Sequence, residues 1–453
     1  MRGHASGIVI LLGILFLLII GNPRNVSAQV QAGKEQEGYI TQVEFPSEET
    51  EKSWRSLRES LPFELHGFLE ARGGLRTQND PHESKTATLG ETRFQLNLSK
   101  ALDWANFRIK SDFLYDGVVE GADVDLREAN AILTPFEFTD FKIGRQILTW
   151  GTGDYIFIND LFPKDYNSFF IGRDDEYLKA PSDALKSSFY TKALNIDFVY
   201  TPRFNPDRFI DGKRLSYFNP QLGRLAGEDA KVRPKKRDEW FEDDEIALRL
   251  YRNIKGYDLA LYGYNGFWKN PMGFDPQTGK ATFPRLSVYG LSARGKVWKG
   301  IGNIEMGYYD SRDDRSGKDP FIPNSQLRFL AGYEQELAKD FTVGMQYYLE
   351  LMSDYGAYKR TLPPGSQAAD EYRHVITLRL TKLLMYQNLR LSLFTFYSPS
   401  DQDAYVRPNI HYKITDHWSA EAGANIFFGK KDHTFFGQFK DNTNVYLGLR
   451  WSF

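Results

Sequence analysis

The stretch NVYLGLRWSF, residues 444–453, decides the fold class of this chain. Every second position in it is apolar, namely Val445, Leu447, Leu449, Trp451 and Phe453, and the positions between are polar or small. Because a β-strand sends successive side chains to opposite faces, the stretch predicts a strand with one wholly apolar face. That face can pack on the core of a soluble sheet or contact lipid. The aromatic residue at its end favours lipid, since aromatic girdles lie at the ends of membrane strands.

The same two-residue period runs from residue 62 to the C-terminus in about 18 segments. In residues 91–99, for example, Phe94, Leu96 and Leu98 alternate with polar or charged residues. Charges on alternate positions of successive strands cannot face a dry core without partners, but they can face a water-filled lumen. The pattern predicts an all-β fold: one closed antiparallel transmembrane β-barrel of about 18 strands over residues 62–453.

The connections between these segments alternate in length. Short ones lie at 253–256, 299–300, 338–340 and 415–417, and long ones at 76–88, 151–182, 202–243, 268–284, 311–324, 353–371 and 429–443. Short periplasmic turns and long outer loops are typical of outer-membrane barrels. We therefore expect the outer membrane of a Gram-negative bacterium, with both ends of the barrel in the periplasm.

Two segments precede the barrel pattern. Residues 1–28 begin with Arg2, continue with an apolar run over 8–20 and end in small residues before Gln29, which predicts a cleaved signal peptide; a retained anchor is the alternative. Residues 29–61 are polar and acidic, and 47–61 have the spacing of a short amphipathic helix. This periplasmic extension could rest in the mouth of the barrel or form a mobile tail.

Composition excludes several classes of function. The chain has no cysteine, so disulfides, thiol nucleophiles and cysteine-based metal sites are absent. A net charge of −2 gives no general attraction to nucleic acid. We expect no cofactor, no metal and no nucleic-acid partner. The mean hydropathy of −0.49 argues against helical membrane proteins but not against barrels, whose strands are apolar at alternate positions only.

The most informative segment is residues 141–190. Gly144-Arg145-Gln146 precedes Trp150-Gly151, and a long connection with Asp160, Pro163, Asp165 and Pro181 follows. The segment resembles alginate-export-type outer-membrane barrels and a related family of uncharacterised porins. The resemblance implies an 18-stranded outer-membrane channel, but nothing in the segment is specific enough to carry over alginate. The terminal Phe453 similarly resembles the barrel-assembly signal of such proteins, which implies the barrel-assembly machinery as a partner.

Residues 151–182 have no strand pattern, and so long a connection is usually functional. It can fold inward and narrow the lumen, or form an extracellular lid on the rim. Its mixture of aromatic and charged residues suits sugars or aromatic acids. The candidate constriction residues are Tyr155, Phe157, Asp160, Lys164, Asp165 and Arg173.

The polar face of the strands predicts the lining of the lumen. The candidate lining residues are Arg72, Arg93, Arg108, Lys110, Arg145, Arg249, Arg294, Arg328, Arg379, Arg407, Arg450, Glu334 and Glu350. Arg145 shares the parity of Ile143, so it reaches the lumen only if Gly144 marks a β-bulge. The excess of arginine predicts a pathway with a modest anion preference, weakened by replacing Arg93 and Arg328; alternatively, these residues form paired ladders within the wall.

We therefore expect an outer-membrane channel for small anionic or polar solutes such as carbohydrates or organic acids, and not an enzyme. The alternatives are a barrel enzyme and a structural barrel or adhesin. The seven histidines are scattered without a zinc-binding spacing, and residues 290–294 depart from the G-x-S-x-G pattern. Residues 310–319 are acid-rich without the spacing of a calcium loop, which leaves a weaker calcium hypothesis. Outer-membrane lipid is a further expected partner, and the basic run 233–237 could contact lipopolysaccharide or be solvated.

Overall fold

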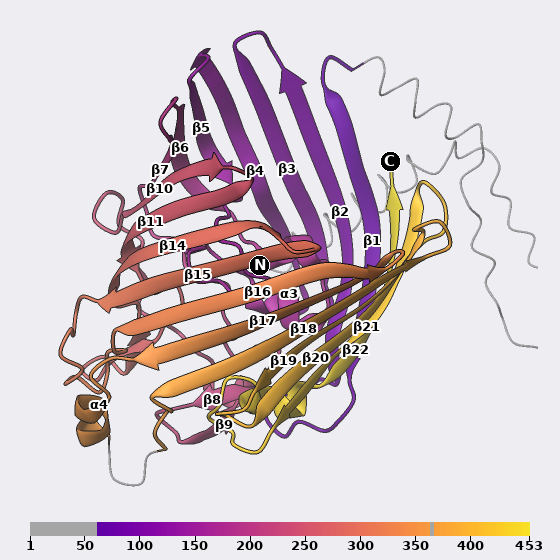
Figure 1. The fold of residues 1–453 in the computed structure, drawn as a ribbon. Coiled ribbons are helices and arrows are strands. Elements are labelled where there is room, and N and C mark those ends of the chain that lie inside the picture. The colour runs from indigo at the N-terminus through magenta and orange to yellow at the C-terminus, as the bar shows by residue number, and fades with distance from the viewer. Residues whose placement is uncertain (1–60, 363–366) are drawn as a thin grey trace, which may run out of the picture.

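The structure, a computed structural model, describes residues 61–362 and 367–453. Eighteen strands form one antiparallel sheet that closes on itself as a barrel (Figure 1). The fold class predicted from the two-residue period is confirmed, including the number of strands. The predicted signal peptide (1–28) and all but the last residue of the predicted helical extension (29–61) lie outside the described residues.

The barrel strands follow one another in chain order. They are β1 (Glu64–Arg76), β2 (Ala87–Ala101), β3 (Ala105–Asp116), β4 (Gly121–Phe136), β5 (Thr139–Gln146), β6 (Ser182–Tyr190), β7 (Asn195–Thr201), β10 (Glu245–Ile254), β11 (Tyr257–Phe267), β14 (Arg285–Val297), β15 (Gly300–Ser311), β16 (Gln326–Ala338), β17 (Phe341–Met352), β18 (Tyr372–Leu384), β19 (Leu389–Ser398), β20 (Asp403–Lys413), β21 (Trp418–Gly429) and β22 (Asn444–Ser452).

The remaining elements belong to the longer connections. They are two small hairpins, β8 (Tyr217–Asn219) with β9 (Arg224–Ala226) and β12 (Gly273–Asp275) with β13 (Lys280–Thr282), and the short helices α3 (Tyr166–Ile171), η1 (Asp175–Leu178), η2 (Glu228–Ala230), α4 (Tyr355–Thr361) and η3 (Gly437–Asn442). None of the helices in the described ranges is long and apolar enough to cross a membrane.

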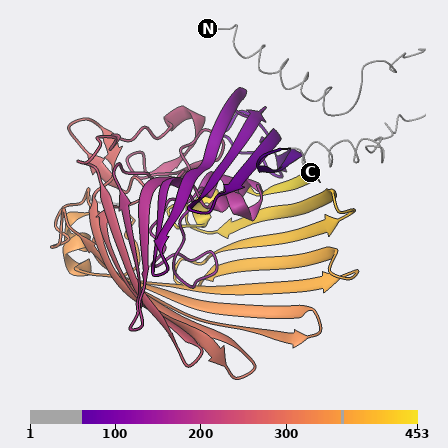
Figure 2. The ribbon, with the colours of Figure 1, turned by 90° about the horizontal axis from the view of Figure 1, so that it is seen from above.

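The barrel closes between its first and last strands. β1 pairs with β22 in continuous antiparallel register from Phe68 opposite Ser452 to Arg76 opposite Asn444. The backbone of Phe453 extends this ladder through two hydrogen bonds to Gly67, of 3.0 and 3.2 Å. Figure 2 shows the result, with the indigo start of the barrel beside its yellow end. The C-terminal stretch is thus the seam of the barrel.

The two faces of the sheet differ as the alternation predicts. Outward-facing Ile109, Leu261, Ile304 and Met345 are 47, 57, 48 and 54% exposed. Their neighbours along the strands face inward and carry the charges, such as Glu305 beside Ile304. Large aromatic side chains are exposed toward both ends of this apolar band: Trp104, Phe136, Phe138, Tyr257, Trp298 and Tyr386 near one end, and Tyr115, Tyr289, Tyr308, Tyr372, Tyr397 and Phe428 near the other. Such belts are the interface girdles of a membrane barrel.

The connections define two ends of the barrel. At the turn end, where β1 begins and β22 ends, strands are joined by two to four residues; at the loop end the connections are mostly much longer. Two loop-end connections, 117–120 and 399–402, are as short as turns. The predicted long connection 151–182 begins too late, because β5 ends at Gln146. Trp150 is therefore part of the following connection, and its ring is buried.

Leu261, in the middle of β11, tests the outward apolar band. Its ladder neighbours are Leu250 and Leu291, so the surrounding surface is apolar. Replacing Leu261 by Arg should destabilise the barrel in lipid by about 2–4 kcal/mol, since arginine at the bilayer midplane is costly. Denaturant titration of the protein folded into vesicles measures this loss. Leu261→Phe keeps the site apolar and should change stability little; an equal loss in both variants would contradict a lipid-facing band.

Candidate functional site

The connection between β5 and β6, residues 147–181, lies inside the barrel; we call it the inward loop. It contains α3, which is drawn within the outline of the barrel in Figure 1. Its backbone accepts hydrogen bonds from the wall on several strands: Arg72 of β1 donates to Gly172 O over 2.9 Å, and Arg127 of β4 donates to Glu176 O and Lys179 O over 2.9 Å. The geometry therefore matches the inward alternative of the sequence analysis and not the rim lid.

Local sequence ends α3 on both sides. The Asp165 carboxylate caps its N-terminus by accepting a hydrogen bond from Ser168 N over 2.8 Å. Gly172 ends the helix in the left-handed region with φ = 85°, where a residue without Cβ is unstrained. A Cβ at this position would also collide with the ring of Tyr446 on β22. The glycine therefore allows the loop to lie directly against the wall.

Glu305 of β15 holds the first half of the inward loop. Its side chain is 1% exposed and accepts hydrogen bonds from the backbone N–H groups of Thr152 and Asn159, each over 2.7 Å. The hydroxyl of Thr152 donates a third bond to the same carboxylate over 3.0 Å. A buried carboxylate needs hydrogen-bond donors, and the N–H groups of the loop need acceptors, so each supplies the partner that the other requires.

Four acidic side chains of the inward loop are paired with wall cations on separate strands. These ion pairs attach the loop to β3, β18, β20 and β22, and so to both sides of the seam. They are Glu176 with Lys110 at 2.6 Å, Asp154 with Arg379 at 3.3 Å, Asp175 with Arg407 at 2.6 Å, and Asp174 with Arg450 at 3.0 Å.

Aromatic packing fixes α3 further. Phe169 and Phe170 of the helix lie against Tyr405 of β20, with ring centroids 5.7 and 5.4 Å away. Tyr405 in turn stacks on Phe427 of β21, at 4.7 Å with an interplanar angle of 7°. All four rings are buried. Burial of rings this size stabilises the inward position by several kcal/mol, on the order of 2 kcal/mol for each side chain.

A second connection, residues 202–244, also enters the lumen, which the sequence did not predict. Arg208 forms two 2.8 Å bonds with the carboxylate of Asp125 on β4. Arg214 pairs with Asp116 at the end of β3. Asp207 accepts a hydrogen bond from Lys164 N over 2.7 Å, joining the two loops. Burial raises the pKa of Asp207 to about 6, although nearby Lys164 and Lys269 oppose the shift.

Twelve of the thirteen predicted lining residues lie on the inward face of the sheet. Residues directly opposite each other on neighbouring strands share a face of the sheet. Glu70 is opposite Arg93, and Gly344 lies between Glu334 on one side and Arg379 on the other, so these residues share the inward face. The inward set is Arg72, Arg93, Arg108, Lys110, Arg249, Arg294, Arg328, Arg379, Arg407, Arg450, Glu334 and Glu350.

The prediction for Arg145 is wrong. The β4–β5 ladder stays in register through Gly144, with Asn130 opposite Gly144 and Ala129 opposite Arg145, so no bulge reverses the parity. Arg145 keeps the outward parity of Ile143, which is 48% exposed. Its guanidinium binds the Asp183 carboxylate through bonds of 2.8 and 2.9 Å. The unusual φ of 113° at Gly144 changes the backbone locally without shifting the pairing.

Several predicted site residues are too buried to contact a solute. Arg93 is 3% exposed and pairs with Asp112 at 2.6 Å. Asp160, Lys164 and Asp165 are 4, 2 and 2% exposed and form bonds within the inward loop or to its neighbours. Of the others, Arg173 binds Glu91, Tyr155 binds Asp175, and Phe157 stacks under Lys164. These residues shape and attach the loop.

Water-exposed cations on the inward face lie nearer the turn end. Arg294, Lys296 and Arg390 are exposed, and none of them has an ion-pair partner within 4.0 Å in the described part of the chain. Lys142 and Lys186, which the sequence analysis did not select, also face inward. Both lysines alternate with outward-facing residues along β5 and β6, and this alternation could have identified them from the sequence as inward-facing. Within the described residues, loops thus fill the lumen at the loop end, and the wall side chains are exposed to water toward the turn end.

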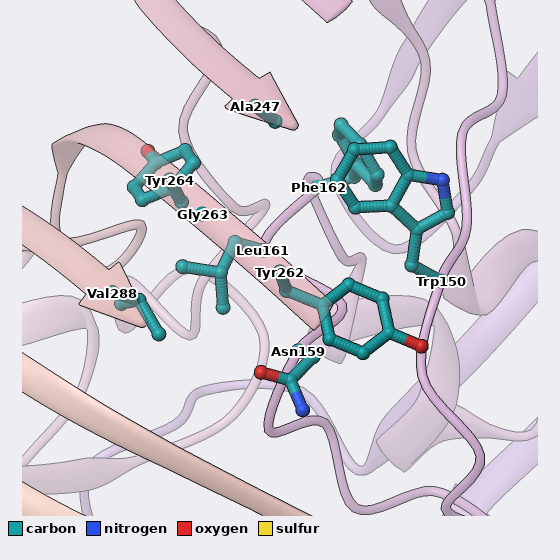
Figure 3. A pocket seen from close by; sticks show the side chains of 9 residues that line it. All are labelled: Trp150, Asn159, Leu161, Phe162, Ala247, Tyr262, Gly263, Tyr264 and Val288. Carbon is teal, nitrogen blue, oxygen red and sulfur yellow. The ribbon is translucent and has the colours of Figure 1, made fainter. Parts of the chain in front are cut away.

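Figure 3 shows a small cavity behind the inward loop. Its lining is mostly apolar and comes from the loop and from β10, β11 and β14: Trp150, Asn159, Leu161, Phe162, Ala247, Tyr262, Gly263, Tyr264 and Val288. It is a gap in the packing between loop and wall rather than a pathway. Within the described ranges, no three His, Asp or Glu side chains are placed to hold a metal ion.

Comparison with known proteins supports the fold. No family model matches the sequence, and no curated protein matches it. The structure is similar to crystal structures of Acinetobacter baumannii OccAB3 and OccAB1, with a TM-score of 0.51 for each. The identities are 10 and 9%, and the matches cover 86% of this chain and 98 and 96% of those chains. At such identity the likeness shows the fold alone.

Glu305 provides a test of how the inward loop is held. Glu305→Leu removes three hydrogen bonds and leaves two backbone N–H groups of the loop without partners, so residues 151–160 should open more often. Hydrogen exchange of peptides covering these residues should accelerate by about tenfold or more, since a hydrogen bond to a charged group contributes roughly 1.5–3 kcal/mol. Glu336→Leu, on the same face of the neighbouring β16 but near a turn, is the control. Unchanged exchange in Glu305→Leu would contradict the anchoring role.

Proposed function

We propose that this chain is an outer-membrane channel through which small polar solutes, preferentially anions, diffuse. The observation that carries the proposal is the division of the lumen: a fixed loop narrows the loop end, and exposed cations line the wet turn end. A barrel interior that is charged and water-accessible, inside an exterior that is apolar, is the physical requirement for a solute pathway.

The orientation belongs to the same proposal. Long loops face the outside of the cell and short turns face the periplasm, as in other bacterial barrels. The C-terminal strand then meets the assembly machinery from the periplasm, and the loop that contains 233–237 is placed toward lipopolysaccharide. Within that run Arg237 is tied to Asp243 at 3.0 Å, so the remaining cations are the ones available for such contact.

The substrate class follows from which charges remain accessible. Most wall arginines under the loops are paired and buried, as the paired-ladder alternative expects. Arg294 and Arg390 are exposed and without ion-pair partners among the described residues. A low-dielectric wall focuses the field of such charges into the lumen and favours anions. Organic acids and acidic sugars are the solutes that fit this field.

Reversal potentials in planar bilayers test the proposal. The wild-type protein should conduct in discrete steps and prefer anions. Arg294→Gln with Arg390→Gln should lower the anion-to-cation permeability ratio by roughly two- to threefold at 0.1 M salt, from two charges acting over about 10 Å of water. Arg93 and Arg328 should contribute little to selectivity, because Arg93 is 3% exposed and Arg328, with a side chain only 17% exposed, pairs with Glu350 at 3.3 Å. A wild-type pore that prefers cations, or a protein that never conducts, would contradict this proposal.

A further inference from the structure

A charged strip crosses the inner wall of the barrel on six neighbouring strands, β3, β4, β5, β6, β7 and β10. In it four cations share two carboxylates, because each carboxylate lies between two cations. In strand order the strip consists of Arg108, Glu128, Lys142, Lys186, Asp197 and Arg249.

The ion pairs of this strip are loose. Glu128 is 3.7 Å from Arg108 and 3.8 Å from Lys142. Asp197 is 3.5 Å from Lys186 and 3.9 Å from Arg249. These distances exceed those of ordinary charge-assisted hydrogen bonds, roughly 2.7–2.9 Å. The pairs under the loops are much tighter, for example 2.6 Å for Arg72 with Glu421 and for Arg407 with Asp175.

Strand register places the two lysines of the strip face to face. Lys142 of β5 is directly opposite Lys186 of β6. Their Cβ atoms are therefore about 5 Å apart, and like charges in this position destabilise a sheet. A carboxylate bound between the two ammonium groups would remove the repulsion. Arg108 and Arg249 each lie two strands farther out, roughly 10 Å away along the wall.

The cations of the strip are accessible while its carboxylates are not. Side-chain exposure is 46% for Arg108, 24% for Lys142, 29% for Lys186 and 28% for Arg249, against 9% for Glu128 and 3% for Asp197. The acids lie beneath and the cations extend toward the lumen. Nε of Arg249 is buried with no hydrogen-bond partner among the described residues.

Neighbouring groups do not supply the missing negative charge. Asp197 already accepts a 2.6 Å bond from Ser188. Asp140, the carboxylate of β5, accepts bonds of 2.6 Å from Thr134 and 3.0 Å from Tyr190 and makes no ion pair with the strip within the described ranges. The strip thus retains an excess of positive charge on the lumen side.

We propose that this strip is a binding site for small organic polycarboxylates, with one carboxylate between Lys142 and Lys186 and another on Arg108 or Arg249. The site deepens the proposed function, because it gives the channel a stopping point for a class of anion. It selects carboxylates by number and spacing, whereas the exposed arginines at the turn end act through the general field.

Calorimetric titration of the detergent-solubilised barrel with citrate tests the site without requiring conductance. Acetate at the same ionic strength is the monovalent control. Lys142→Gln with Lys186→Gln should weaken citrate binding by at least about tenfold, since two charged contacts are lost. Arg294→Gln with Arg390→Gln removes the same charge from the lumen elsewhere and should leave citrate binding within about twofold, a small effect of distant screened charge. Heat-dependent gel mobility verifies that each variant is folded.

The outcomes separate the site from the channel. Citrate binding that depends on Lys142 and Lys186 supports the site even if the protein does not conduct. A conducting protein that binds citrate no better than acetate, or equally in wild type and in the folded lysine variant, overturns the site and leaves the channel standing. Equal losses in both double variants also overturn it, because general charge and not this strip would then attract the anion. Lys142→Arg with Lys186→Arg keeps both charges and should retain most of the binding; loss in that variant would contradict a charge-based site.

Discussion

The rest of the structure depends on the need to pair every backbone N–H and C=O group of a strand that crosses lipid. An open sheet leaves two unpaired edges, which lipid cannot satisfy, so the sheet must close. Closure is made by the β1–β22 ladder, which continues through the backbone of Phe453. Once the sheet is closed, a two-residue period has only one consequence: an apolar exterior and a polar interior. The charged lumen therefore follows from a constraint that acts on the backbone.

Charged side chains inside a barrel must either form ion pairs or face water, and both arrangements occur in this barrel. At the loop end the inward loop brings Glu176, Asp175, Asp174 and Asp154 to wall cations, while α3 buries its rings against Tyr405. These ion pairs and the buried rings offset part of the conformational entropy that the loop loses when it is ordered. Toward the turn end no loop of residues 61–362 or 367–453 covers the wall, and side chains such as Arg294 and Arg390 are exposed. The same residue type thus has a structural role in one half and faces solvent in the other.

The barrel could be predicted from sequence because its signal is local. A period of two over five residues fixes which side chains share a face, and that rule placed Arg72, Arg379 and Glu334 correctly. The same rule places Arg145 on the outward face, which is correct; the prediction failed because Gly144 was interpreted as a β-bulge. The contacts of the inward loop could not be predicted, since the Asp154–Arg379 pair joins residues brought together only by closure. The opposition of Lys142 and Lys186 depends on the register of two strands separated by a 35-residue connection, which sequence spacing does not determine.

Selectivity in such a lumen cannot be inferred from the number of arginines on the inward face. Arg93 and Arg407 have the same parity as Arg294, yet the first two are sealed in ion pairs beneath loops and the third is exposed. A paired, buried guanidinium presents little field to a passing ion, because its carboxylate cancels it at a distance of a few ångströms. An exposed or incompletely neutralised one acts across the water-filled space, within the Debye length of about 10 Å at 0.1 M salt. The loops therefore control which ions pass in two ways. They narrow the lumen, and by pairing and covering some wall charges they determine which charges still act on an ion in the lumen.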